Sequence, residues 1–182
     1  MKILLHACCG PCSVKCAESL LAEDIRPALF WYNPNIHPVT EYLSRKNALA
    51  QYAGAAGLEL IQRDEYGLRP FIAGIFPDFD RRCDYCYRLR LDAAASYGAQ
   101  HGYEAFCTTL LISPYQNHDR IRAIASQISE RRRIPFLYRD FRPLFREGQQ
   151  AARRMGLYMQ KYCGCIFSEE DRYIRRPAAR PQ

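Results

Sequence analysis

The sequence has no apolar run long enough to cross a membrane, and it has few lysines. Its first residues, MKILLHACC, are too short an apolar stretch for a secretory signal or a membrane span, and no small-residue cleavage site follows them. We therefore expect a cytoplasmic protein with no membrane segment. Thiols stay reduced in the cytosol, so the nine cysteines favour metal binding or catalysis over a disulfide framework.

The glycine-rich phosphate loops of nucleotide-binding proteins are also missing. Neither G-x-G-x-x-G nor G-x-x-x-x-G-K-[ST] occurs, and the turn after the first expected strand, HACCGPCS, holds only Gly10 among its thiols. A nucleotide cofactor is therefore poorly supported.

Arginine dominates the positive charge of the chain. Lysine and arginine together number 26 against 19 acidic residues, which gives a formal net charge of +7, and only four of the 26 are lysine. The planar guanidinium binds phosphates through parallel donors, so an arginine-rich surface favours a nucleic-acid or phosphate partner. A general bias toward arginine, without a binding role, would give the same excess of positive charge.

Apolar runs alternate along the chain with helical patterns. Strands are expected at 2–5, 27–32, 58–61, 105–112 and 134–138, and helices at 12–22, 38–56, 83–101 and 118–132. This order predicts one α/β domain over residues 1–174, with a mostly parallel sheet and helices on both faces. Residues 175–182 are expected to form a flexible basic tail. Sheets of this kind bind ligands beyond the carboxyl ends of their strands, where HACCGPCS lies.

Seven of the nine cysteines fall in three short motifs. They are Cys8, Cys9 and Cys12 in HACCGPCS, Cys83 and Cys86 in RCDYCYRLRL, and Cys163 and Cys165 in YCGC. The start of a helix favours thiolate formation in the first motif. Four thiolates from the first two motifs suit either a tetrahedral zinc or an iron–sulfur cluster, and adjacent cysteines fit the separate irons of a cluster better than a single zinc.

The third motif differs in kind. Cys163 and Cys165 are too close for two ordinary ligands of one zinc, but the glycine between them permits the strained backbone of a C-x-C disulfide. Strained disulfides are readily reduced, which suits a pair that relays electrons. Exposed thiols and additional metal ligands are the alternatives.

Four sequence blocks carry a family resemblance. LLHACCGPCS, RCDYCYRLRL, TTLLISPYQNH and YMQKYCGC, in this order from Leu4 to Cys165, resemble the signature blocks of the QueH-type epoxyqueuosine reductases. The resemblance implies a Rossmann-like fold similar to adenine-nucleotide alpha-hydrolase-like proteins, and a 4Fe-4S cluster. It also implies reduction of the epoxide of epoxyqueuosine to the alkene of queuosine at the wobble position of tRNA.

The resemblance also implies roles for matching residues. The cluster ligands would be Cys8, Cys9, Cys83 and Cys86, and the redox-active pair would be Cys163 and Cys165. A second iron beside the cluster is implied too, for which Cys12 and Asp84 are the neighbouring candidates. The sequence does not identify the electron donor.

The remaining candidates concern the substrate. Tyr115 could stack on an unpaired base while Gln116 or Asn117 contacts its edge, although a strand followed by a helix cap would explain the same residues. His6, His118 and Tyr115 are candidate proton donors, and Arg153 and Arg154 are candidate phosphate ligands.

Two other functions stay open: an iron–sulfur-dependent tRNA sulfur-transfer enzyme and a non-catalytic zinc-binding nucleic-acid module. The missing phosphate loop counts against the first, and the labile C-x-C pair counts against the second.

Overall fold

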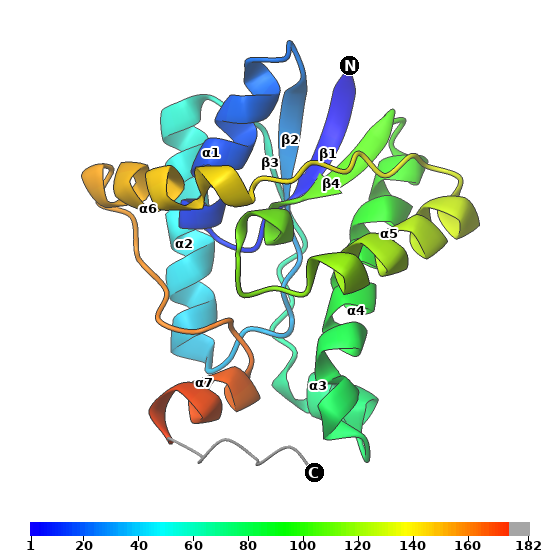
Figure 1. Cartoon of the computed structure of the whole chain (residues 1–182), viewed down its shortest axis with the longest axis vertical. Helices are drawn as coiled ribbons and strands as arrows, with labels where there is room; N and C mark the ends of the chain where they lie inside the picture. Colours follow the sequence, from blue (N-terminus) through cyan, green and yellow to red (C-terminus); the bar gives the residue numbers. More distant parts are fainter. Residues whose placement is uncertain (175–182) are drawn as a thin grey trace.

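Parallel strands form the middle layer of the fold (Figure 1). The computed structural model describes residues 1–174, so the tail expected at 175–182 lies outside the described residues. The strands are β1 (Lys2–His6), β2 (Arg26–Trp31), β3 (Leu60–Gln62) and β4 (Ala105–Thr108). The helices are α1 (Gly10–Leu21), α2 (Val39–Ala56), α3 (Leu68–Ile75), α4 (Arg82–Gln100), α5 (His118–Arg132), α6 (Phe145–Arg154) and α7 (Ile166–Tyr173). Short 3-10 turns occur at η1 (Phe79–Arg81), η2 (Thr109–Ile112) and η3 (Arg142–Leu144).

The sheet has the order β3-β2-β1-β4, and its described pairs are all parallel. β1 is central, because Leu4 lies opposite Ala28 of β2 on one side and Phe106 of β4 on the other. Figure 1 shows α1, α2 and α6 on one side of the sheet and α4 and α5 on the other. This arrangement confirms the predicted α/β class. Within residues 1–174, no helix is long and apolar enough to cross a membrane.

The strand expected at 105–112 is wrong in its second half. The chain leaves the sheet after Thr108, whose hydroxyl accepts a hydrogen bond from the Leu110 amide at 3.2 Å as η2 begins. All residues of η2 are nevertheless buried. The apolar run therefore indicated that these residues are buried, and not that they are extended. The turn places Thr109 next to Cys8 of the first cysteine motif.

The strand expected at 134–138 is also wrong. This segment makes a single parallel bridge, between Phe106 and Phe136. Its two hydrogen bonds run from Phe106 N to Pro135 O at 2.9 Å and from Leu137 N to Phe106 O at 2.8 Å. Pro135 has no N–H with which to continue a ladder, so the segment stays an edge contact.

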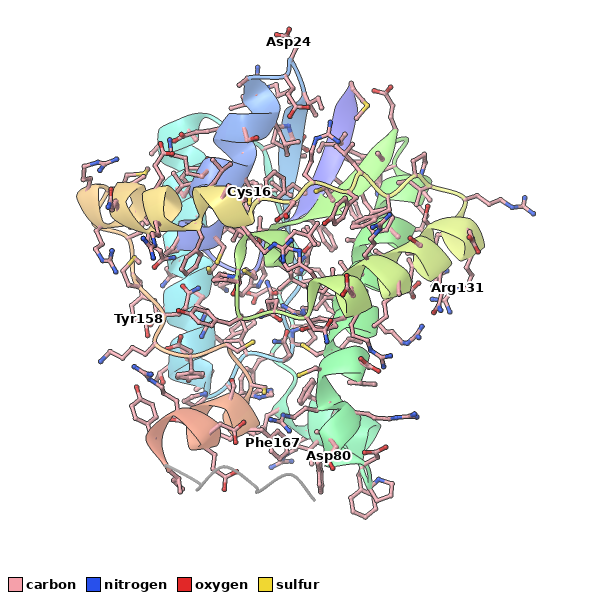
Figure 2. All side chains as sticks on the ribbon, in the orientation of Figure 1. Cys16, Asp24, Asp80, Arg131, Tyr158 and Phe167 are labelled. Atoms are coloured by element: carbon pink, nitrogen blue, oxygen red, sulfur yellow. The ribbon has the colours of Figure 1, made fainter. Side chains whose placement is uncertain are left out.

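Three described helices, α3, α6 and α7, were not predicted. α6 buries only Gly148, Ala151 and Ala152, and it packs against α1. Such small residues give little apolar periodicity in the sequence. α7 has no fully buried residue, but it is tied to the start of α4 by the Arg82–Asp171 ion pair, 2.8 Å long. Figure 2 shows Phe167 of α7 near Asp80 of η1.

Close packing of α1 on α2 gives a first prediction. A Cβ atom at Gly10 would lie 2.6 Å from the backbone oxygen of Ala48, whereas one at Gly54 would meet nothing within 4 Å. We expect Gly10→Ala to destabilise the protein by about 1–3 kcal/mol, because a backbone atom must move. The matched variant Gly54→Ala should stabilise it by about 0.5–1 kcal/mol through helix propensity. Denaturant unfolding measures both, and equal effects of the two changes would contradict the packing.

Candidate metal centre and substrate cavity

The first cysteine motif lies where β1 ends and α1 begins. Cys9 is the N-cap of α1, Cys12 lies in its first turn, and Cys8 precedes both. The three Sγ atoms lie within 4.8 Å of one another, and those of Cys8 and Cys9 are 3.8 Å apart. These sulfurs are close enough to ligate one metal ion together or to bind to neighbouring irons.

Hydrogen bonds favour the thiolate form of the Cys8 side chain. The Cys12 and Cys9 thiols hydrogen-bond to it and hold the pKa of Cys8 well below its ordinary value. Thr109 contributes too, since its hydroxyl accepts from Cys8 N at 3.0 Å and donates to Cys8 Sγ at 3.3 Å. The same thiol contacts raise the pKa of Cys12, and burial raises that of Cys9. A metal that binds here would meet one thiolate and displace the protons of its neighbours.

The second motif occupies the first turns of α4. Cys86 is buried, which raises its pKa to about 12, and its Sγ accepts a hydrogen bond from Arg90 Nη2 at 3.1 Å. Cys83 is exposed. Neither sulfur belongs to the close group formed by the first motif. Asp84 is paired with Arg120, whose Nε lies 2.9 Å from Asp84 Oδ1.

The third motif places its two thiols in different surroundings. Cys163 is exposed, and its Sγ accepts a hydrogen bond from Gln116 Nε2 at 3.1 Å. Cys165 is buried and packs in a small apolar cluster that also contains Cys86. Gly164 between them has a φ of +151°, a conformation that other residues rarely adopt, as expected for this glycine. Both cysteines are free thiols.

A buried arginine of α2 holds this third motif in place. Arg45 is 1% exposed and donates to the backbone oxygens of Cys163 at 2.7 Å and Tyr162 at 2.9 Å. Its charge is balanced by Glu41, whose Oε1 accepts from Arg45 Nε at 2.7 Å. Glu41 in turn accepts from the Tyr158 hydroxyl, and Figure 2 shows Tyr158 beside α2. The segment from Tyr158 to Cys163 is therefore fixed to α2 by charge-assisted hydrogen bonds.

A cavity of about 810 Å³ joins the first and third motifs. Cys8, Cys12 and Cys163 line it, together with Arg45 and Arg90. Of the expected substrate residues, Tyr115, Gln116 and Arg153 line the cavity, whereas His118 and Arg154 do not. The wall thus combines thiols, guanidinium groups and amides, which suits a polar substrate.

The two histidines proposed as proton donors lie away from this wall. His6 is fully buried, with Nδ1 2.9 Å from Thr108 Oγ1 and Nε2 3.3 Å from Tyr32 O, and burial lowers its pKa to about 4. His118 begins α5, and burial lowers its pKa as well. Among the three candidates, Tyr115 is the one that reaches the cavity.

Sequence analysis missed four residues that contact the thiols or hold them in place. They are Thr109 beside Cys8, Arg45 behind Cys163, Arg90 beside Cys86, and Gln160, whose Nε2 lies 3.4 Å from Cys12 Sγ. Gln160 lies inside the YMQKYCGC block, and Arg90 follows Cys86 by one helical turn. Spacing relative to a cysteine was the signal that could have found Gln160 and Arg90, whereas no local pattern marks Thr109 or Arg45.

The fold is shared with a solved structure described as a predicted subunit of a tRNA methyltransferase from Methanocaldococcus jannaschii. The TM-score is 0.55 at 13% sequence identity, and the match covers 84% of this chain and 74% of that one. At this identity the likeness concerns the fold alone. It is consistent with the expected adenine-nucleotide alpha-hydrolase-like architecture.

Sequence relatives define the class of protein more closely. Residues 3–171 match the family model described as epoxyqueuosine reductase QueH. Relatives of that name include one from Dehalococcoides mccartyi, 34% identical over 94% of both chains. Another, from Thermotoga maritima, is 33% identical over 91% of this chain and 89% of its own.

The chain is thus an enzyme of the reductase class. More particularly, it belongs to the epoxyqueuosine reductase QueH family. This membership favours a reductase over the sulfur-transfer enzyme and the zinc-binding module.

Proposed function

We propose that this protein reduces the epoxide of epoxyqueuosine to the alkene of queuosine at the tRNA wobble position, with a 4Fe-4S cluster and a redox-active dithiol. The observation that carries the proposal is the shared cavity, which brings thiols of the first and third cysteine motifs to one wall. Removing the epoxide oxygen as water takes two electrons and two protons. A pair of thiols supplies both when it is oxidised to a disulfide.

The proposed iron–sulfur cluster would take its thiolates from two motifs. Cys8 and Cys9 from the first motif and Cys83 and Cys86 from the second would be its ligands, and the cluster would supply single electrons. Cys12, close to Cys8 and Cys9, is the better candidate for a second iron. Asp84 would first have to leave its ion pair with Arg120.

The third motif supplies the two-electron chemistry in this proposal. Oxidation of the Cys163 and Cys165 thiols to a disulfide releases two electrons and two protons, which matches the reduction of one epoxide to an alkene and water. Cys163 faces the cavity, and Gln116 donates to its sulfur. Of the three candidate proton donors, Tyr115 lines the cavity, and its hydroxyl could deliver a proton to the leaving oxygen. An external donor, still to be identified, would then reduce the disulfide.

The cavity rim suits an RNA loop. The Tyr115 ring is 87% exposed and stands edge-on to Phe145, with 6.0 Å between ring centroids. Exposed aromatic rings stack on unpaired bases, and neighbouring arginines bind phosphates. Arg146 and Arg153 of α6 line the same cavity. A tRNA substrate implies a cytoplasmic location for the protein. The number of free cysteines favours the same location.

The function has a direct test by mass analysis. Anaerobic, cluster-loaded protein with a strong reductant should convert epoxyqueuosine in tRNA to queuosine without ATP, seen as loss of one oxygen from the modified nucleoside. Cys163→Ser should abolish turnover, because the dithiol cannot form a disulfide. Cys107→Ala, a change in the buried strand β4 away from the cavity, is the control. No loss of oxygen with loaded protein would contradict the function.

The cluster assignment has a separate test. Replacing Cys8, Cys9, Cys83 or Cys86 with serine should prevent stoichiometric iron and sulfide binding, because each removes one thiolate ligand. Cys163→Ser and Cys165→Ser should retain both. Iron and sulfide content and the absorption spectrum, measured without oxygen, decide the matter. A single zinc without sulfide in the wild-type protein would contradict the cluster, and iron loss in the Cys163 or Cys165 variant would make that residue a ligand.

Neighbouring arginines of α6 allow a matched test of RNA contact. Arg153 lines the cavity and Arg154 does not, although both are exposed. Arg153→Gln should raise the KM for tRNA about fivefold, as loss of about 1 kcal/mol of phosphate binding would, with kcat nearly unchanged. Arg154→Gln should have a smaller effect. Equal KM values for the two variants across a salt series would contradict a cavity-specific contact.

A further inference from the structure

Arg90 is a buried cation without a carboxylate partner. It is 3% exposed, and in the part of the chain that the structure describes no acidic group lies within ion-pair distance of it. Its hydrogen bonds go to Cys86 Sγ at 3.1 Å, Cys86 O at 3.2 Å and Asn33 Oδ1 at 3.5 Å. The other buried arginine, Arg45, is by contrast neutralised by Glu41 at 2.7 Å.

The burial of such a charge needs compensation. A guanidinium stays protonated in proteins, so it cannot escape the cost of burial by losing its proton. An isolated buried cation costs several kcal/mol unless an anion balances it, and carbonyl dipoles balance it only in part. Negative charge on the groups around Arg90 would supply the rest of this compensation.

Sulfur atoms are the candidates for that charge. Arg90 donates to Cys86 of the second motif and lines the cavity together with Cys8 of the first and Cys163 of the third. Arg90 thus lies among the three cysteine motifs. The neighbouring cysteines become anions when they lose their protons and form thiolates.

We propose that Arg90 is the counter-charge of the metal–thiolate centre and that it sets the reduction potential of that centre through the sulfur of Cys86. This inference rests on the metal–thiolate centre of the proposed function. Reduction adds negative charge to such a centre, and a cation that hydrogen-bonds a ligand sulfur stabilises the reduced form. Arg90 acts through a ligand rather than on substrate, so it is a positioning and tuning residue.

An anaerobic potentiometric titration tests the proposal. Cluster-loaded Arg90→Met and Arg90→Gln should both show a reduction potential more negative than wild type, because each removes the charge. Arg90→Lys should recover part of the shift. Arg88→Met, which removes an exposed charge from the same helix, is the control and should leave the potential unchanged. An unchanged potential in both neutral variants at full cluster loading would overturn the proposal.

Thermal stability gives a second readout that needs neither activity nor a redox signal. Loading with metal should raise the Tm of wild type more than that of Arg90→Met, because the charge is compensated only when thiolates are bound to the metal. In metal-free protein, Arg90→Met should melt at or above the wild-type temperature. Equal Tm gains on loading would refute the role of Arg90. If the wild-type protein holds a redox-silent metal without sulfide, the proposed function fails, but this comparison still tests Arg90.

Discussion

The parallel pairing of β1 with β4 is the constraint on which the site depends. It sets His6 opposite Thr108, so that the residues after these two strands emerge side by side at one edge of the sheet. Thr109 then reaches both the amide and the sulfur of Cys8. Two segments a hundred residues apart meet only because the strands share a register, and a slip of that register would separate them.

The carboxyl-terminal motif depends on a different kind of interaction. It follows no strand, and α7 after it has no fully buried residue. Its position comes from hydrogen bonds that Arg45 donates to backbone oxygens, and from the His37 amide, which donates to Gly164 O at 2.8 Å. These contacts hold the segment by its backbone, while the Cys163 side chain lines the cavity and accepts a hydrogen bond from Gln116.

Sequence patterns predicted the parts of this protein that local spacing determines. The buried strand β1, the helices α4 and α5, and the close grouping of Cys8, Cys9 and Cys12 all follow from short-range patterns. The turn η2 could not be predicted, since a buried apolar run looks alike in a strand and in a 3-10 turn. Arg45 and Arg90 were missed because a charged residue one helical turn from a polar one usually marks a solvated surface. Their burial follows from the tertiary packing and cannot be read from local sequence.

The two buried arginines show how charge is distributed in the site. Arg45 lines the cavity but has its own carboxylate, Glu41, beside it. Within residues 1–174 Arg90 has no such carboxylate, and it donates instead to the sulfur of Cys86. In the described part of the chain, one buried arginine is therefore paired with a carboxylate and another with a thiol. In the proposed metal–thiolate centre, a cation of the second kind would stabilise the state that carries more negative charge on the sulfurs.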